Sequence, residues 1–217
     1  GVSHFDGAAW TTYSITDSLE STTVTAMAAA PDGATLPGVW VAAGENDLYH
    51  FDGVTWAPQS LPERWIGERV TALAIGPQDG LWVGFRHALL RFDGRAWTRC
   101  ALPGGLSGVR ALAAGAEGGL WVGGDAGLHR FDGRSWQHVE QEPIWGLAAA
   151  PGGGLWASVE GGLARFDGRA WQPCSIEAGP VAGTVHALAV GADGAVWIGT
   201  SDGLFSSSDR LNCILSH

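Results

Sequence analysis

The sequence has no lysine, one methionine, two tyrosines and three cysteines among its 217 residues. All twelve basic residues are therefore arginines, and with 22 acidic residues the formal net charge is −10. A chain this acidic repels phosphate backbones, which argues against nucleic-acid binding. The sequence also lacks any apolar run near the ~20 residues that a bilayer span needs, so we expect no membrane insertion.

The three cysteines, Cys100, Cys174 and Cys213, show no metal-ligand spacing, and their odd number does not suggest a disulfide framework. We therefore expect neither a zinc site nor structural disulfides. No secretory signal is visible. A start at Gly1 is what a processed chain, an excised or engineered domain, or a part of a larger chain would show.

Glycine and tryptophan are abundant instead, with 34 and 12 residues. Ten of the tryptophans belong to two patterns that each occur five times. The first pattern is Phe-Asp-Gly, two residues and Trp, and it begins at Phe5, Phe51, Phe92, Phe131 and Phe166. The second is Leu/Val-Trp-Val/Ile/Ala, and it contains Trp40, Trp82, Trp121, Trp156 and Trp197. A third pattern, Val/Ile-x-Ala/Gly-Leu/Met-Ala, begins at Val24, Val70, Val109, Ile144 and Val185. A repeat of about 43 residues is typical of a four-stranded propeller blade.

Each repeat contains four short segments of strand character, a to d, separated by turn signals. In one copy strand a is "VRALAAG", strand b "GLWVG" and strand c "GLHRFDG", and strand d starts at the next Trp. The Asp-Gly pair predicts a tight type I′ turn between c and d. Alanines alternate along strand a, as the crowded centre of a propeller requires, whereas Trp fills the wider gaps further out. We predict an all-β fold, a five-bladed β-propeller with four antiparallel strands per blade.

The predicted propeller is a single domain over 1–217, with blade units at about 24–60, 70–101, 109–140, 144–175, and 185–217 together with 1–14. The N-terminal segment has only strands c and d, and the C-terminal segment has a, b and the start of c. We therefore expect the ring to close by pairing of the two terminal segments in one blade, which hides the sheet edges. Which end supplies strand c is left open, because the segment after Gly203 lacks Phe-Asp-Gly and Trp.

The segments "LWVGGDAGLHRFDGRSW" and "VWIGTSDGLF" resemble the two-component regulator propeller repeat. In that family the repeats commonly form extracytoplasmic sensor regions of hybrid histidine kinases, and the ligand is often a carbohydrate. The resemblance thus implies a sensor-type propeller outside the cytoplasm. Because the shared motif is structural, it implies no binding or catalytic residue.

Candidate site residues are those that differ between repeats on the face that carries the b–c and d–a loops. The second residue of strand a varies most, as Thr25, Thr71, Arg110, Trp145 and His186. Together these could hold an anionic or planar ligand or supply acid–base chemistry near the central channel, or they could simply fill it. Further ligand-binding candidates are Arg86 and His87 in a b–c loop. Trp65 in a d–a loop could stack on a ligand or fold inward as a lid.

The favoured function is non-catalytic recognition of a small molecule, glycan or protein on the loop face. One alternative is a lyase or hydrolase that uses His186, Glu160, Asp125 and Arg110 at the axis. Another is a structural or engineered propeller without a ligand. No cofactor is expected. A divalent cation remains a lesser alternative, because several b–c loops carry carboxylates: Glu45, Asp125, Glu160 and Asp202.

Overall fold

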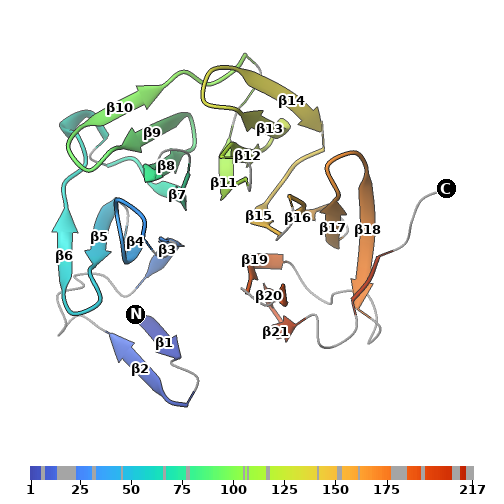
Figure 1. Ribbon diagram of the computed structural model, residues 1–217, viewed down its shortest axis with the longest axis horizontal. Coiled ribbons are helices and arrows are strands. Elements are labelled where there is room, and N and C mark those ends of the chain that lie inside the picture. The colour runs from blue at the N-terminus through green and yellow to red at the C-terminus, as the bar shows by residue number, and fades with distance from the viewer. Residues whose placement is uncertain are drawn as a thin grey trace. The chain divides into compact units, whose positions relative to one another are not determined.

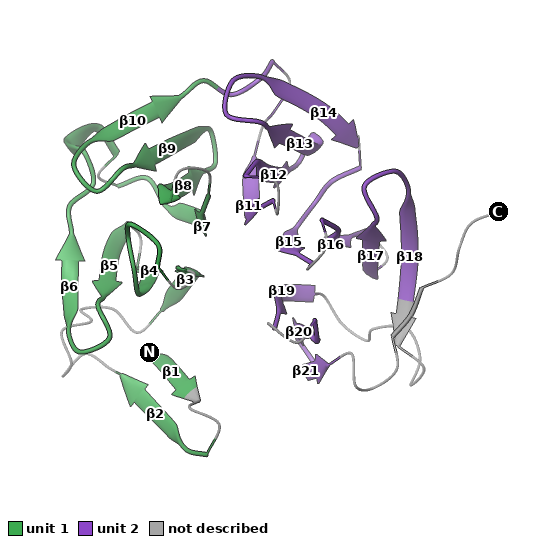
Figure 2. Ribbon diagram, in the orientation of Figure 1, with its two compact units in different colours: residues 1–101 green, residues 102–217 purple. Residues whose placement is uncertain are grey.

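The computed structural model describes the chain except for residues 6–7, 14–22, 31–32, 45, 66, 77–78, 105, 107, 116–117, 141, 151–152, 161, 177–184, 192–193, 207–210 and 214–217. The described residues are almost entirely β-strands and turns, with one turn of 3-10 helix, η2 (Glu63–Trp65). They form two compact units, residues 1–101 and 102–217 (Figure 2). None of the described helix is long and apolar enough to cross a membrane.

Unit 1 contains two complete four-stranded antiparallel sheets and a hairpin. In each sheet the strands lie in chain order (Figure 1). The first sheet is β3 (Val24–Ala29), β4 (Val39–Ala43), β5 (Asp47–Phe51) and β6 (Trp56–Gln59). The second is β7 (Val70–Ile75), β8 (Leu81–Phe85), β9 (Ala88–Phe92) and β10 (Trp97–Cys100). The hairpin is β1 (Val2–Phe5) and β2 (Trp10–Tyr13).

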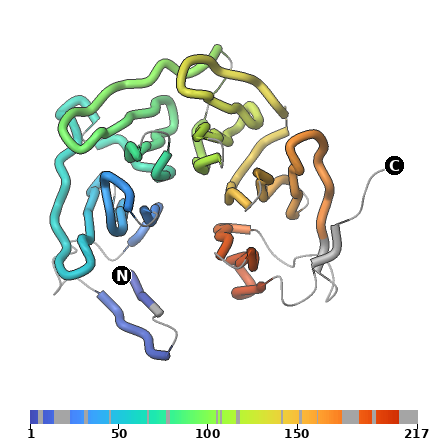
Figure 3. Tube along the Cα trace, viewed as in Figure 1, coloured from blue at the N-terminus to red at the C-terminus, as the bar shows by residue number. Residues whose placement is uncertain are grey.

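Unit 2 continues the same order of strands, which the chain trace follows from hairpin to hairpin (Figure 3). Its first sheet is β11 (Val109–Ala114), β12 (Leu120–Gly124), β13 (Gly127–Phe131) and β14 (Trp136–Glu140). The second is β15 (Gly146–Ala149), β16 (Leu155–Val159), β17 (Gly162–Phe166) and β18 (Trp171–Ile176), with β22 (Leu211–Cys213) added at its edge. The third is β19 (Val185–Val190), β20 (Val196–Thr200) and β21 (Gly203–Ser206).

The repeated antiparallel order of strands a to d confirms the predicted five-bladed β-propeller. It also answers the question about strand c of the last blade, because β21 pairs with β20 along its whole length. The C-terminal segment therefore supplies that strand. Strands β1 and β2 pair with each other. Their joining with β19–β21 in one closing blade stays a prediction, as does the single domain.

The C-terminal strand β22 departs from the sequence prediction. It pairs antiparallel with β18, the outermost strand of the preceding blade, and the register places residue 213 opposite Cys174. Cys174 is disulfide-bonded, so the expectation of no structural disulfide was wrong. Cys100, at the equivalent place in β10, is a free thiol whose pKa is raised by burial.

The turn between strands c and d also differs from the predicted type I′ turn. It is a four-residue loop, because the Phe and Trp on its two sides are direct pairing partners, as Phe131 and Trp136 are. The carboxylate of Asp132 accepts hydrogen bonds from the backbone N–H groups of Arg134 and Ser135, both at 2.7 Å. Gly133 takes the positive φ of 96°. The Asp side chain thus closes the loop where a type I′ turn would use backbone alone.

The strand-b tryptophans are core residues in four blades, as the repeat pattern predicts, whereas Trp197 is 45% exposed and departs from that prediction. Trp40, Trp82, Trp121 and Trp156 are each at most 7% exposed. Each lies opposite the basic residue that precedes Phe-Asp-Gly on strand c. His50 stacks on Trp40 at 4.3 Å between ring centroids, and the Arg165 guanidinium lies 5.8 Å from the ring centroid of Trp156. The recurring basic residue therefore covers the indole of its own blade.

Candidate functional site

The variable second residue of strand a occupies a β-bulge in four blades. The pairing with strand b slips by one residue at this position, and the residue is left out of the ladder. The bulge residues are Thr25, Thr71, Arg110 and His186. An extra residue in a strand bends it locally and redirects the side chain, which explains why different residue types fit here.

In unit 1 the bulge residues bond to their own sheet. The hydroxyl of Thr71 donates a hydrogen bond to the carbonyl of Gly84 at 3.1 Å, and that of Thr25 donates to the carbonyl of Ala42 at 3.4 Å. Each acceptor lies in strand b of the same blade. These two threonines have a structural role at the β-bulge of strand a.

Arg110, the bulge residue of β11, makes contacts of another kind. Its Nε donates a hydrogen bond to Oδ1 of Asp125 at 2.5 Å, an ion pair in which both side chains are about two-fifths exposed. Its guanidinium carbon lies 4.7 Å from the ring centroid of Trp145. Trp145 is 44% exposed. The structure thus brings together three predicted site residues, Arg110, Asp125 and Trp145, from two neighbouring blades of unit 2.

The backbone holds these three side chains in place. Asp125 stands in the turn between β12 and β13. Gly108 has a φ of 62°, and a Cβ there would overlap Oδ2 of Asp125. Ile144, which is fully buried, donates its N–H to the carbonyl of Gly124 at 3.0 Å. That bond ties the residue before Trp145 to the end of β12, beside the ion pair.

A second backbone bond continues the anchoring of Trp145. Its N–H donates to the carbonyl of Ser158 at 3.0 Å, which extends the pairing of β15 with β16. The indole is therefore fixed at its base by two blades, although it is exposed at its ring.

The arrangement does little for stability, because exposed ion pairs contribute about 0–1 kcal/mol and exposed cation–π contacts about 0.5–1 kcal/mol. Its effect is to orient a guanidinium. Asp125 binds the Nε side of the Arg110 guanidinium, and the ring of Trp145 lies against one face of it. The two terminal nitrogens of the guanidinium form its remaining edge. A planar guanidinium edge binds carboxylate or phosphate oxygens in pairs. The exposed indole can stack on a planar or sugar-like group.

The other predicted residues of unit 2 belong to other elements than this cluster. His186 is exposed on β19, and Glu160 is exposed in the turn after β16. Among the described residues, no ion pair joins His186 to a carboxylate. Nor do three or more His, Cys, Asp or Glu side chains gather in the described part of the chain as they would around a metal ion. Glu45 lies outside the described residues.

Unit 1 holds the remaining candidates. Arg86 and His87 are exposed in the turn between β8 and β9. Trp65, in η2, folds inward: its ring stacks on Phe85 with centroids 5.1 Å apart, and it packs on the core cluster of unit 1. Arg64 and Arg99 lie within 6 Å of its ring centroid. Of the two alternatives for Trp65, the structure shows the inward one.

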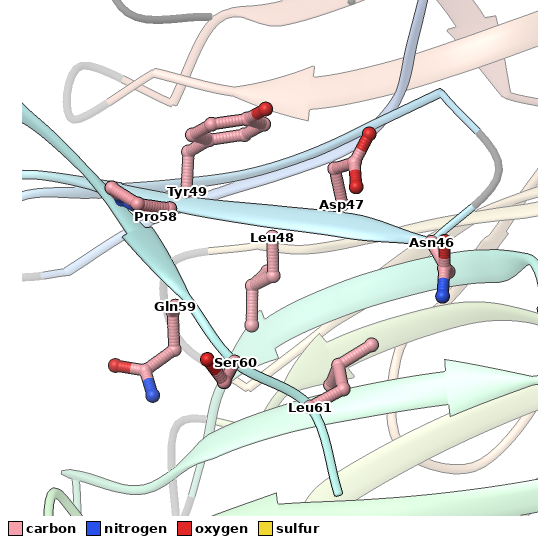
Figure 4. A pocket seen from close by; sticks show the side chains of 8 residues that line it. All are labelled: Asn46, Asp47, Leu48, Tyr49, Pro58, Gln59, Ser60 and Leu61. Carbon is pink, nitrogen blue, oxygen red and sulfur yellow. The ribbon is translucent and has the colours of Figure 1, made fainter. Parts of the chain in front are cut away.

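A pocket of about 340 Å³ in unit 1 was missed by sequence reasoning (Figure 4). It lies between the start of β5 and the segment that follows β6. Its polar groups come mainly from Asn46, Asp47, Gln59 and Ser60, and Leu48 and Leu61 line it from the apolar side. The available signal was Asp47, since strand c starts with Ala88, Gly127, Gly162 or Gly203 in the other blades.

Comparison with solved structures supports the fold. With 19% identity, the chain matches YCF48 bound to D1 peptide at a TM-score of 0.61, covering 88% of this chain and 66% of that one. It matches virginiamycin B lyase from Staphylococcus aureus at 0.65 with 15% identity, covering 88% and 66%. The extracellular domain of a hybrid two component system from B. thetaiotaomicron matches at 0.70 with 15% identity, covering 97% and 31%.

The chain thus spans less than two thirds of the length of each of these structures. The sequence matches no protein-family model and no curated protein. The similar structures include an extracellular domain of a two component system, a peptide-bound protein and a lyase, so the fold alone is compatible with recognition and with catalysis.

Proposed function

We propose that this chain is a non-catalytic recognition module of the sensor-propeller type, with its ligand bound at Arg110 and Trp145. The observation that carries the proposal is the guanidinium of Arg110, held at its Nε by Asp125 and against the ring of Trp145. A side chain fixed in this way loses less conformational entropy when a ligand binds. The ligand is a small molecule, glycan or protein segment that presents an anionic or planar group.

The site supports recognition because it contains an oriented donor and an aromatic surface, both of them exposed. Asp125 neutralises the charge of Arg110. The ligand is therefore selected by the pattern of hydrogen bonds rather than by net charge. The similarity to an extracellular two-component domain and to a peptide-bound propeller supports the same class of function.

We also propose an extracytoplasmic location. The disulfide at Cys174 supports it, because structural disulfides persist in oxidising compartments and are rare in the cytosol. The resemblance to two-component regulator propeller repeats supports it as well.

The test is a thermal-shift and tryptophan-fluorescence screen with citrate, succinate, inorganic phosphate, glucose and galactose, and with unstructured peptides that have a free C-terminal carboxylate. We expect at least one probe to bind saturably to the wild type and to lose binding in Arg110→Ala and in Trp145→Ala. Arg134→Ala, a turn arginine on another loop, is the matched control and should bind as the wild type does. Binding that survives both site variants would refute the site.

The variant His186→Ala distinguishes the enzyme alternative from a recognition module. A lyase or hydrolase that uses His186 loses turnover in this variant while ligand binding persists. A recognition module shows no turnover of its bound probe in either protein.

A further inference from the structure

The outer strands of the blade β11–β14 contain a histidine pair that the repeat does not explain. His129 in β13 and His138 in β14 are direct pairing partners across the two strands. Their imidazole rings lie 4.7 Å apart between centroids, with 56° between the ring planes. In the other three complete blades the same two positions hold Tyr49 and Pro58, Leu90 and Arg99, or Ala164 and Pro173, and in the hairpin β1–β2 they hold Ser3 and Thr12.

The two histidines differ in exposure. His129 is 4% exposed, and among the described residues its Nδ1 is buried without a hydrogen-bond partner. His138 is exposed to solvent. An unpartnered polar nitrogen in a protein interior costs free energy, so its presence calls for an explanation. A core position that is apolar in neighbouring blades gains nothing from a histidine as packing material.

We propose that His129 and His138 form a two-imidazole binding site for a late divalent transition-metal ion of the zinc, nickel and copper class. Imidazole nitrogen is a preferred ligand of these ions. With metal–nitrogen bonds of about 2.0–2.1 Å, two imidazoles on one ion have ring centres about 5 Å apart, close to the separation seen here. The coordinated ion uses the lone pair of the buried nitrogen, and the exposed His138 is the side from which the ion enters. Water completes the coordination.

Burial, with the neighbouring His138 as a smaller cause, lowers the pKa of His129. The site is independent of the proposed function, because it lies on the outer strands c and d, whereas Arg110 and Trp145 belong to the start of strand a.

The experiment is calorimetric titration of the untagged chain with ZnCl₂ at pH 7.5. We expect one saturable site per chain in the wild type. The variant His138→Arg, which takes the residue that the blade β7–β10 has at this place, should weaken Zn²⁺ binding by more than about tenfold. His129→Leu, again the residue of that blade, should do the same. His87→Ala removes an exposed histidine in a turn of unit 1 and should leave the affinity unchanged.

A second measurement counts the ligands directly. With one equivalent of Cu²⁺, the electron paramagnetic resonance spectrum of the wild type should show two equivalent imidazole nitrogens. Because His138 is exposed, His138→Arg should fold, so its result stands even if His129→Leu does not fold. The proposal is overturned if the wild type shows no saturable site, if His138→Arg binds Zn²⁺ as tightly as the wild type, or if the copper spectrum shows a single nitrogen.

Discussion

Gly108 leaves the space into which the carboxylate of Asp125 fits. A Cβ at position 108 would overlap Oδ2 of that residue, and the φ of 62° already favours glycine. The side chain that orients Arg110 is therefore positioned by the absence of another side chain. This relationship makes the candidate site sensitive to a substitution that removes none of its functional groups.

Gly108→Ala should destabilise the protein by about 1–3 kcal/mol and should displace Asp125 from Arg110. The reason is twofold: the left-handed backbone strain and the overlap with the carboxylate. Gly118→Ala is the control, because Gly118 has a φ of 77° and open space around its missing Cβ. Gly118→Ala should lose stability through the backbone strain alone. Urea unfolding of both variants measures the difference, and equal losses would contradict the steric part of the argument.

Acid should weaken the c–d loops through their aspartates. Two backbone N–H bonds, from Ser135 and Arg134, lower the pKa of Asp132 to about 2 from its ordinary value of 3.8. A depressed pKa in the folded state means that the stabilisation is present above pH 3.8 and is lost as the pH falls toward 2. Thermal melts of the wild type and Asp132→Ala from pH 6 to pH 2 should therefore converge at the acid end. A difference that stays constant over this range would contradict the assignment.

Removal of a guanidinium from the outer surface of a blade should loosen the indole beneath it. Arg165→Ala is expected to cost about 0.5–1 kcal/mol, because the Arg165 guanidinium covers Trp156, which is 7% exposed. Its tryptophan fluorescence should shift to the red as water reaches the ring. Arg169→Ala, in the turn that follows, is the comparison and should leave the emission maximum unchanged. An unshifted spectrum in Arg165→Ala would show that the pairing is incidental.

The disulfide at Cys174 should link the outer strand β18 to the C-terminal strand. The register of β18 with β22 places residue 213 opposite Cys174, so non-reducing peptide mapping should find Cys174 joined to the peptide that contains residue 213. Cys174→Ser should lower the free energy of unfolding by about 2–4 kcal/mol under oxidising conditions. Under reducing conditions the two proteins should unfold alike. A mapped bond to Cys100 would contradict the register.

The repeat made the blades predictable, because strand periodicity, turn residues and Trp spacing are local properties of the chain. The pairing of β22 with β18 was not predictable in this way. It is a choice between distant sheet edges, which depends on three-dimensional packing rather than on residues nearby in sequence. The c–d loop was assigned the wrong turn, since the Asp-Gly signal does not reveal that the Asp side chain itself bonds to the backbone.

The candidate site was predicted in part. Variation between repeats identified Arg110 and Trp145, and loop position identified Asp125. That these three meet depends on a bulge and on the bond from Ile144 to Gly124, neither of which leaves a sequence signal. The histidine pair was not predicted, because candidate residues were chosen among variable positions on the loop face, whereas His129 and His138 lie within the outer strands. Trp65 was left open and proved to pack on Phe85.

The bulge in strand a has a consequence for how such a protein can change over generations. The residue at this place has no direct partner in the strand register, so threonine, arginine or histidine can stand there while the pairing on both sides is kept. Four of the blades thus carry one bulge position at which threonine, arginine or histidine stands. New specificities can arise at these places one at a time, without renewed selection for foldability.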